Sequence, residues 1–156
     1  MKVSLGNDHA GFRMRPDVKE ILSGLGCETI DFGSTSEDPV DFPDIAQAVC
    51  NAVKTKQATR GIMVCGTGVG AVIAANKIAG IRAALCHDVH SAHQSVEHDD
   101  VNVLCLGAQI IGPWLAKDII EAFIHAQFRD EEPFRGRVAK IRNLERVMAR
   151  EVIDEC

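Results

Sequence analysis

Apolar residues along this chain gather in short, nearly continuous runs that alternate with stretches of helical periodicity. Continuous apolar runs are typical of strands buried on both faces, as in a parallel sheet covered by helices. Five such runs predict strands over 3–6, 27–32, 61–65, 81–86 and 101–106. Because helical stretches separate the strands, we predict an α/β fold with one open parallel sheet and helices on both sides.

The intervening segments carry their apolar residues at helical spacing. We predict helices over 16–25, from Asp41 onward, over 71–77, 91–97, 113–128 and 134–152. The last helix has an apolar stripe at 134, 138, 141, 144, 148 and 152. A tail helix needs a surface on which to bury such a stripe, so we expect this one to pack on a partner subunit.

Length, charge and hydropathy restrict the class of protein. The chain has 156 residues, enough for one domain with a sizeable core, and no linker or repeat divides it, so we predict a single domain over 1–156. A net charge of −5 without a dense basic block argues against nucleic-acid binding. There is no apolar run of about 18 residues, so we expect no membrane-spanning helix. The first residues resemble a strand and not a secretion signal, so we expect a cytoplasmic protein.

The sequence over 65–70, Cys-Gly-Thr-Gly-Val-Gly, follows a predicted strand and opens a predicted helix. In open parallel sheets ligands bind at the carboxyl ends of the strands, where this loop falls. Glycines allow a close backbone approach, and N–H groups at a helix start attract anions. The pattern is neither the dinucleotide fingerprint nor a P-loop, because its spacing differs and no Lys-Ser/Thr pair follows.

Cys65 lies at the entrance of this loop. A thiol near a helix N-terminus can have its pKa lowered, which makes it available as a base or a nucleophile. The alternative is a tight structural turn after a buried strand-end cysteine. We favour the functional interpretation because the glycine loop follows directly.

Titratable residues in other loops add to this chemistry. Asp8 and His9 lie in the first strand-to-helix loop, where they pair an acceptor with a titratable donor.

Four histidines lie in one stretch of the sequence: His87, His90, His93 and His98. Histidines three residues apart on a helix can present metal ligands on one face, but here no cysteine or glutamate completes a zinc signature. We therefore expect one functional histidine and choose His98, which ends a predicted helix just before the fifth strand. We place it at the carboxyl ends of the strands.

These motifs together resemble one family. They are Asp8-His9-Ala10-Gly11, Asp31-Phe32-Gly33, the 65–70 loop, Ala75-Asn76-Lys77, Gly80-Ile81-Arg82-Ala83, Ser91-Ala92, His98, Asn102-Val103 and Gly107. Over nearly its whole length the chain is similar to the ribose-5-phosphate isomerase B and galactose-6-phosphate isomerase family. The resemblance implies a Rossmann-like three-layer sandwich, assembly as a dimer or tetramer, and active sites shared between subunits. It also implies aldose–ketose isomerisation through an enediolate, with no metal and no cofactor.

The resemblance assigns a role to each residue of the site. Cys65 would remove a proton from the carbon next to the carbonyl, and Thr67 would assist the proton's movement. His98 of the partner subunit would open the sugar ring. The N–H groups of the loop would stabilise the enediolate oxygen. The loop residues concerned are Gly66, Gly68, Val69 and Gly70. Asp8 and Asp99 would hold hydroxyls, and His9 and Arg137 would hold the phosphate.

Departures from the family pattern concern the substrate. Ribose-phosphate members often have arginine where this chain has Pro133 and Gln109, and Arg135 or Arg13 are the available substitutes. The resemblance places Gln109 in the substrate site, and a glutamine at this position looks closer to the galactose-phosphate branch.

Ribose 5-phosphate to ribulose 5-phosphate is the leading reaction, with galactose 6-phosphate or a tetrose phosphate as alternative substrates. Two other interpretations stay open. One is a non-catalytic sugar-phosphate-binding subunit of a mixed oligomer, against which the retained Cys65 argues. The other is a metal-dependent enzyme that uses the histidine stretch.

Overall fold

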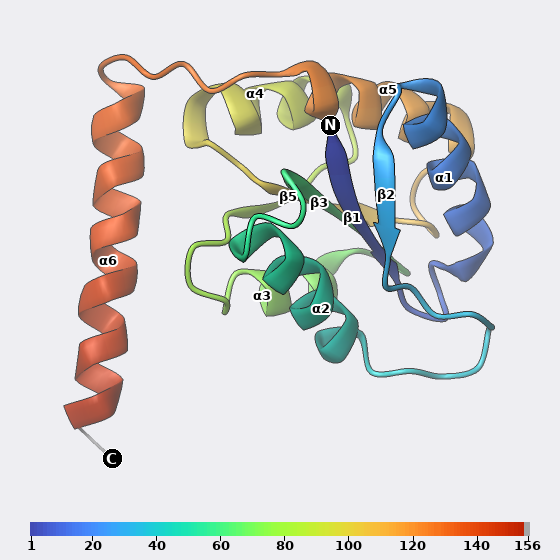
Figure 1. Cartoon of the computed structure of the whole chain (residues 1–156), viewed down its shortest axis with the longest axis horizontal. Helices are drawn as coiled ribbons and strands as arrows, with labels where there is room; N and C mark the ends of the chain where they lie inside the picture. Colours follow the sequence, from blue (N-terminus) through green and yellow to red (C-terminus); the bar gives the residue numbers. More distant parts are fainter. Residues whose placement is uncertain (155–156) are drawn as a thin grey trace.

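A parallel sheet lies between two layers of helices in this computed structural model, which describes residues 1–154 (Figure 1). The strand order is β2-β1-β3-β5-β4, so β3 is the central strand. The strands are β1 (Lys2–Asn7), β2 (Glu28–Asp31), β3 (Arg60–Cys65), β4 (Ala83–Leu85) and β5 (Val103–Gly107). All four neighbouring pairs are parallel, which confirms the predicted α/β class and the five strands.

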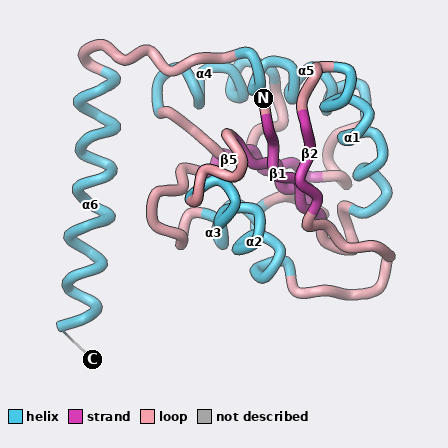
Figure 2. The backbone as a smooth tube through the Cα atoms, viewed as in Figure 1, coloured by secondary structure: helices cyan, strands magenta, loops and turns pink. Residues whose placement is uncertain are grey.

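The helices cover the two faces of the sheet unequally (Figure 2). One layer contains α1, α4 and α5, which share a core with the sheet, and the other contains α2 and α3. Within residues 1–154 the helices are α1 (Arg15–Gly24), preceded by the 3₁₀ turn η1 (Phe12–Met14), then α2 (Phe42–Lys54), α3 (Val69–Ala75), α4 (Val89–Asp99), α5 (Pro113–His125) and α6 (Phe134–Asp154). No helix in this described part is long and apolar enough to cross a bilayer.

Strand β3 shows why the sequence runs are continuously apolar. Successive side chains of a strand point to opposite faces. Ile62 and Val64 therefore enter the core under α1, α4 and α5, whereas Met63 and Cys65 enter the core under α2 and α3. Both faces of β3 are covered by helices, so its odd-numbered and its even-numbered positions are both apolar. Cys65 belongs to the α2–α3 side, which fixes the face on which its thiol lies.

Helix α6 runs beside the sandwich and apart from the sheet (Figure 1). Two polar contacts tie it to the body. Arg142 donates to Asp100 at 3.1 Å, and the Glu145 carboxylate accepts from the Gly80 N–H at 2.8 Å. The predicted helix over 134–152 is confirmed, and packing of its apolar stripe on a partner stays a prediction. Among its residues up to 148, whose side chains the structure describes, the exposed large apolar ones are Ile141, Leu144, Val147 and Met148.

Candidate active site

The loop after β3 turns tightly over the carboxyl end of the sheet. Gly68 has φ +78°, a left-handed conformation that strains residues with a Cβ, and a Cβ there would lie 2.5 Å from Leu85 Cδ1. Helix α3 then begins at Val69. Cys65 is buried at the base of this turn, and Thr67 is exposed at its tip. The backbone N–H groups of Gly68 and Gly66 both act to lower the pKa of the Cys65 thiol.

Three influences set the protonation of the thiol. Burial raises the pKa of Cys65, and hydrogen bonding and charge repulsion from Asp8 raise it further. The N–H groups of Gly68 and Gly66 oppose this and lower the pKa, but the net direction is upward. The lowered pKa expected from the helix start is therefore wrong in sign for the ligand-free chain. The reason is that a dry site and an adjacent carboxylate outweigh the loop dipoles.

The first strand-to-helix loop places Asp8 and His9 beside the Cys65 loop. The Asp8 N–H donates to Val64 O at 3.2 Å, and its buried carboxylate accepts from the Gly11 N–H at 2.9 Å. His9 Nδ1 accepts a hydrogen bond from the Val40 N–H at 3.3 Å. The neutral ring then carries its proton on Nε2, which leaves a donor for a ligand.

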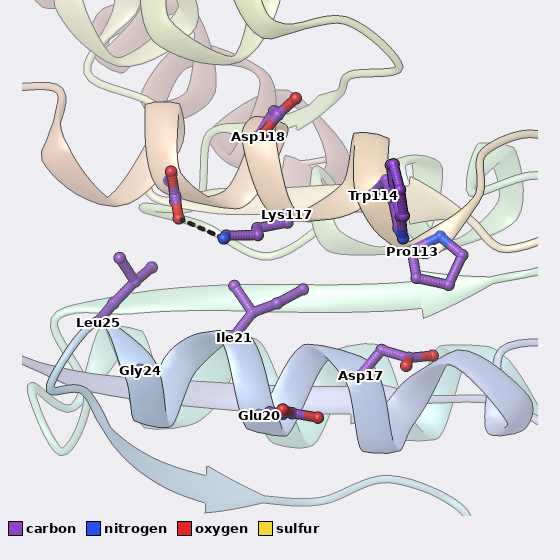
Figure 3. Close-up of a pocket in the computed structure, with 10 residues that line it drawn as sticks. Asp17, Glu20, Ile21, Gly24, Leu25, Pro113, Trp114, Lys117 and Asp118 are labelled. Atoms are coloured by element: carbon purple, nitrogen blue, oxygen red, sulfur yellow. Dashed lines mark ion pairs between the residues drawn. The ribbon is translucent and has the colours of Figure 1, made fainter.

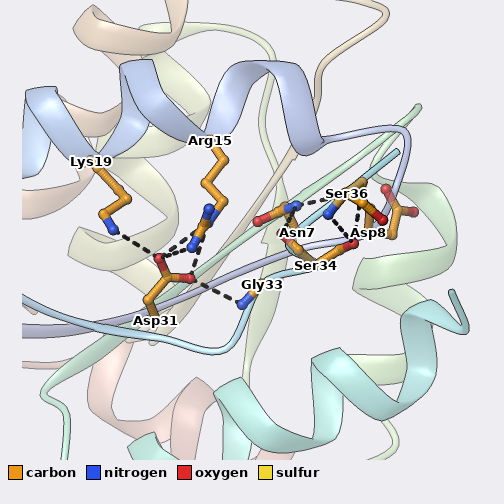
Figure 4. A network of polar contacts seen from close by, with 8 residues as sticks. All are labelled: Asn7, Asp8, Arg15, Lys19, Asp31, Gly33, Ser34 and Ser36. Carbon is orange, nitrogen blue, oxygen red and sulfur yellow. Dashed lines mark hydrogen bonds and ion pairs between the residues drawn. The ribbon is translucent and has the colours of Figure 1, made fainter. Parts of the chain in front are cut away.

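A polar network behind this loop fixes its position (Figure 4). Asp31, at the end of β2, accepts hydrogen bonds from the Arg15 guanidinium at 2.6 Å and from the Gly33 N–H at 3.0 Å. Asn7 Nδ2 donates to Ser34 O at 3.4 Å. The Arg15 contact, together with hydrogen bonding to Lys19, lowers the pKa of Asp31 against the effect of burial. These contacts connect the segments at the carboxyl ends of β1 and β2, next to the loop that carries Asp8 and His9.

The loop after β5 brings Gln109 to the same place. The Ala108 N–H donates to Cys65 O at 2.8 Å, and the Gln109 N–H donates to Gly66 O at 2.9 Å. A Cβ on Gly66 would lie 3.2 Å from Gln109 Oε1. Gln109 also lines a hollow with His9 and Arg13, and Arg13 is held by Glu37 through two hydrogen bonds of 2.9 and 3.0 Å.

His98 and Asp99 lie at the opposite edge of the sheet from Cys65, at the amino ends of the strands. Helix α4 starts after the carboxyl end of β4 and returns to the amino end of β5. Gly61 pairs with Val103 at that end and Cys65 pairs with Gly107 at the other, so the two edges are roughly 13 Å apart along β3. The carboxyl-edge location expected for His98 is therefore wrong, because a residue that ends a helix before a parallel strand lies at that strand's amino end.

A second cluster forms around Phe134 at the start of α6. The His98 ring stacks on the Phe134 ring with centroids 4.2 Å apart. The guanidinium groups of Arg129 and Arg137 lie 5.0 and 6.0 Å from the centroid of that ring. The structure thus brings His98 and Arg137 together, with Asp99 exposed beside them, but far from Cys65.

The histidine stretch does not converge on one point. His93 Nε2 pairs with Glu97 at 3.2 Å, and His87 Nε2 accepts from the Gly107 N–H at 3.0 Å. Among the residues that the structure describes, no three His, Cys, Asp or Glu side chains form a group suited to a metal ion. His87, and not His98, lies at the carboxyl edge of the same chain. Its position directly after β4 was the available signal, which the sequence interpretation did not use.

A further hollow lies between α1 and α5 (Figure 3). Its lining includes Ile21, Leu25 and the strongly exposed Trp114, and Lys117 pairs with Glu121 across 3.8 Å. This hollow is on the flank of the sandwich, whereas the predicted site residues lie at the two edges of the sheet. The candidate active site is therefore the Cys65 loop with its neighbours from β1 and β5.

Comparison with known proteins gives consistent similarities. The family model described as Ribose/Galactose Isomerase matches residues 3–141. Ribose-5-phosphate isomerase B of Escherichia coli is 43% identical over 81% of this chain and 85% of its own. D-erythrulose-4-phosphate isomerase of Pectobacterium atrosepticum is 39% identical over 82% of this chain and 85% of its own. The solved structure of Clostridium thermocellum ribose-5-phosphate isomerase B superposes with a TM-score of 0.92 at 41% identity, covering 95% of this chain and 99% of that one.

Proposed function

The chain belongs to the ribose/galactose isomerase family, and on that premise we propose that it interconverts ribose 5-phosphate and ribulose 5-phosphate. It is a sugar-phosphate isomerase of the aldose–ketose type. The ribose substrate is supported by the name of the Escherichia coli relative. A tetrose phosphate is the second candidate, because the Pectobacterium relative has nearly the same identity and carries the erythrulose 4-phosphate name.

The observation that carries the mechanism is a buried thiol at the base of the tight glycine turn that opens α3. Cys65 as thiolate removes the proton from the carbon next to the carbonyl and returns it to the neighbouring carbon. The negative charge that develops on oxygen is stabilised by the N–H groups of the loop, each worth about 3–4 kcal/mol in a transition state. Asp8 raises the pKa of Cys65, which makes the thiolate a stronger base once it forms.

Two subunits complete the site in this proposal. Cys65, Asp8 and His9 lie at one edge of the sheet, while His98 and Arg137 lie at the other, so one chain cannot join them. The partner's His98 then opens the sugar ring, the partner's Asp99 holds a hydroxyl, and the partner's Arg137 holds the phosphate.

Exposed apolar residues flank both halves of this site. Val69 and Ile73 on α3 adjoin the Cys65 loop, and Ile141 and Leu144 on α6 follow the Phe134 cluster. A two-fold axis that packs α3 of one chain on α6 of the other would bury both surfaces twice. Assembly as a dimer or a tetramer, the cytoplasmic location and independence of a cofactor remain predictions.

The test measures turnover by the purified protein of ribose 5-phosphate, galactose 6-phosphate and erythrulose 4-phosphate. We expect ribose 5-phosphate to react, Cys65→Ala to lose turnover, and Cys27→Ala, a half-buried thiol at the other edge, to keep it. Turnover of another sugar alone would change the assigned substrate. Full activity of Cys65→Ala would remove Cys65 as the base, and silence on all three sugars would favour a binding subunit.

A further inference from the structure

The carboxyl end of β5 is held by a side chain where backbone pairing with β4 stops. Leu85 pairs with Cys105, and the Cys86 N–H donates to Cys105 O at 3.2 Å. Two residues further along β5, the Gly107 N–H has no backbone acceptor from β4 and donates instead to Nε2 of the His87 imidazole at 3.0 Å. An accepting Nε2 requires a neutral ring with its proton on Nδ1.

Gly107 is packed against both this imidazole and Thr67 of the Cys65 loop. A Cβ on Gly107 would lie 2.7 Å from the Thr67 carbonyl oxygen and 2.9 Å from His87 Nε2. The Thr67 carbonyl and the His87 ring therefore pack against the same face of Gly107, which has no side chain to keep them apart. A movement of Gly107 toward or away from β4 changes the support of that carbonyl.

The Thr67 carbonyl shares a rigid unit with a donor of the site. Its C=O and the Gly68 N–H belong to one planar peptide group, so they turn together. The Gly68 N–H acts on the Cys65 thiol and lowers its pKa. A chain of contacts thus runs from His87 through Gly107 to the Thr67–Gly68 peptide, whose N–H influences the thiol.

We propose that His87 is a positioning residue for the isomerisation, which holds the Thr67–Gly68 peptide in place through the Gly107 backbone. The inference rests on the proposed function for its kinetic consequence only, since the chain of contacts itself is a property of the ligand-free protein. His87 acts through Gly107 and not on the sugar.

Three variants separate the effect of the His87 hydrogen-bond acceptor from the effect of the space that the side chain fills. His87→Leu fills similar space without an acceptor. His87→Gln keeps an acceptor at a similar reach and is the conservative replacement. His90→Leu is the matched control, because His90 is exposed in the first turn of α4. If His87→Leu does not fold, His87→Asn replaces it, because its shorter amide does not reach Gly107.

The kinetic expectation is a loss in kcat with little change in KM. A displacement of about 1 Å in a catalytic group costs up to roughly a hundredfold, so we expect kcat of His87→Leu to fall about ten- to a hundredfold. We expect His87→Gln to recover most of this loss and His90→Leu to match the wild type. Equal kcat in His87→Leu and wild type, or a loss that His87→Gln does not recover, would overturn the proposal.

A second readout needs no substrate. The pH dependence of Cys65 alkylation by iodoacetamide, followed by peptide mass spectrometry, reports the pKa of that thiol. Displacing the Gly68 N–H should raise the pKa of Cys65 in His87→Leu and leave it unchanged in His90→Leu. If the wild type turns over no sugar phosphate, the proposed function fails and this readout still decides the positioning role. An unchanged alkylation profile in His87→Leu would overturn it.

Discussion

Mixing two inactive variants of this chain is expected to restore activity. Cys65→Ala removes the proposed base at the carboxyl ends of the strands, and His98→Ala removes the proposed ring-opening group at their amino ends. Each variant alone has the same defect in every site. In a mixed dimer, one shared site collects both defects and the other collects neither.

The size of the effect follows from the geometry. The edges are roughly 13 Å apart along β3, so no single chain supplies both groups to one substrate. After equal amounts are unfolded together and refolded, random pairing makes about half of the dimers mixed, each with one intact site of two. Roughly a quarter of the wild-type turnover should then return.

The assay compares refolded mixtures with each variant refolded alone. Cys65→Ala mixed with Asp8→Asn is the matched control, because both changes lie in the same half-site and their mixed dimers contain no intact site. Activity near a quarter in the first mixture and none above the single variants in the control would support the shared site. No recovery in the first mixture, or full activity of His98→Ala alone, would refute it.

Two further predictions concern charge near the thiol and near His9. Asp8→Asn removes a charge that raises the pKa of Cys65, so the pKa should fall and the midpoint of Cys65 alkylation should move to lower pH; an unchanged midpoint would contradict this. If Arg13 binds the phosphate, Arg13→Gln should raise KM for the sugar phosphate about tenfold, which corresponds to the loss of one charge-assisted hydrogen bond. Glu37→Gln should lower KM, because it releases Arg13 from its ion pair with Glu37. Lys54→Gln, an equal loss of charge on α2, is the control, and equal KM values in all variants would exclude Arg13 as a phosphate ligand.

Features set by local chemistry were predictable from the sequence. The run over 61–65 has no polar position, which indicates a strand buried on both faces, and it became the centre of the sheet. The glycines after Cys65 predict a tight turn into a helix, and Gly68 has the left-handed backbone that such a turn needs. The helix over 134–152 follows from its apolar stripe and begins at the predicted Phe134.

Features set by distant parts of the chain were not predictable in the same way. The sign of the Cys65 pKa shift depends on burial and on Asp8, which the fold brings from another strand. The His87 to Gly107 hydrogen bond depends on β4 being next to β5, and the five apolar runs look too alike to reveal their order. The location of His98, in contrast, was predictable from the sequence. In a fold of alternating helices and parallel strands, a helix that precedes a strand ends at that strand's amino end, and the sequence interpretation placed His98 at the carboxyl end instead.

The central position of β3 has a consequence for how this protein can diverge. The thiol and its backbone donors are attached to the innermost strand, where a change disturbs both layers of the core. His98, Asp99 and Arg137 are attached to the outer helices α4 and α6, whose surfaces tolerate replacement. In the proposed two-subunit site the base is thus attached to the part of the fold least free to change, whereas the partner contributes surface residues, so duplicated copies of such a gene can alter the partner's contribution while the base stays in place.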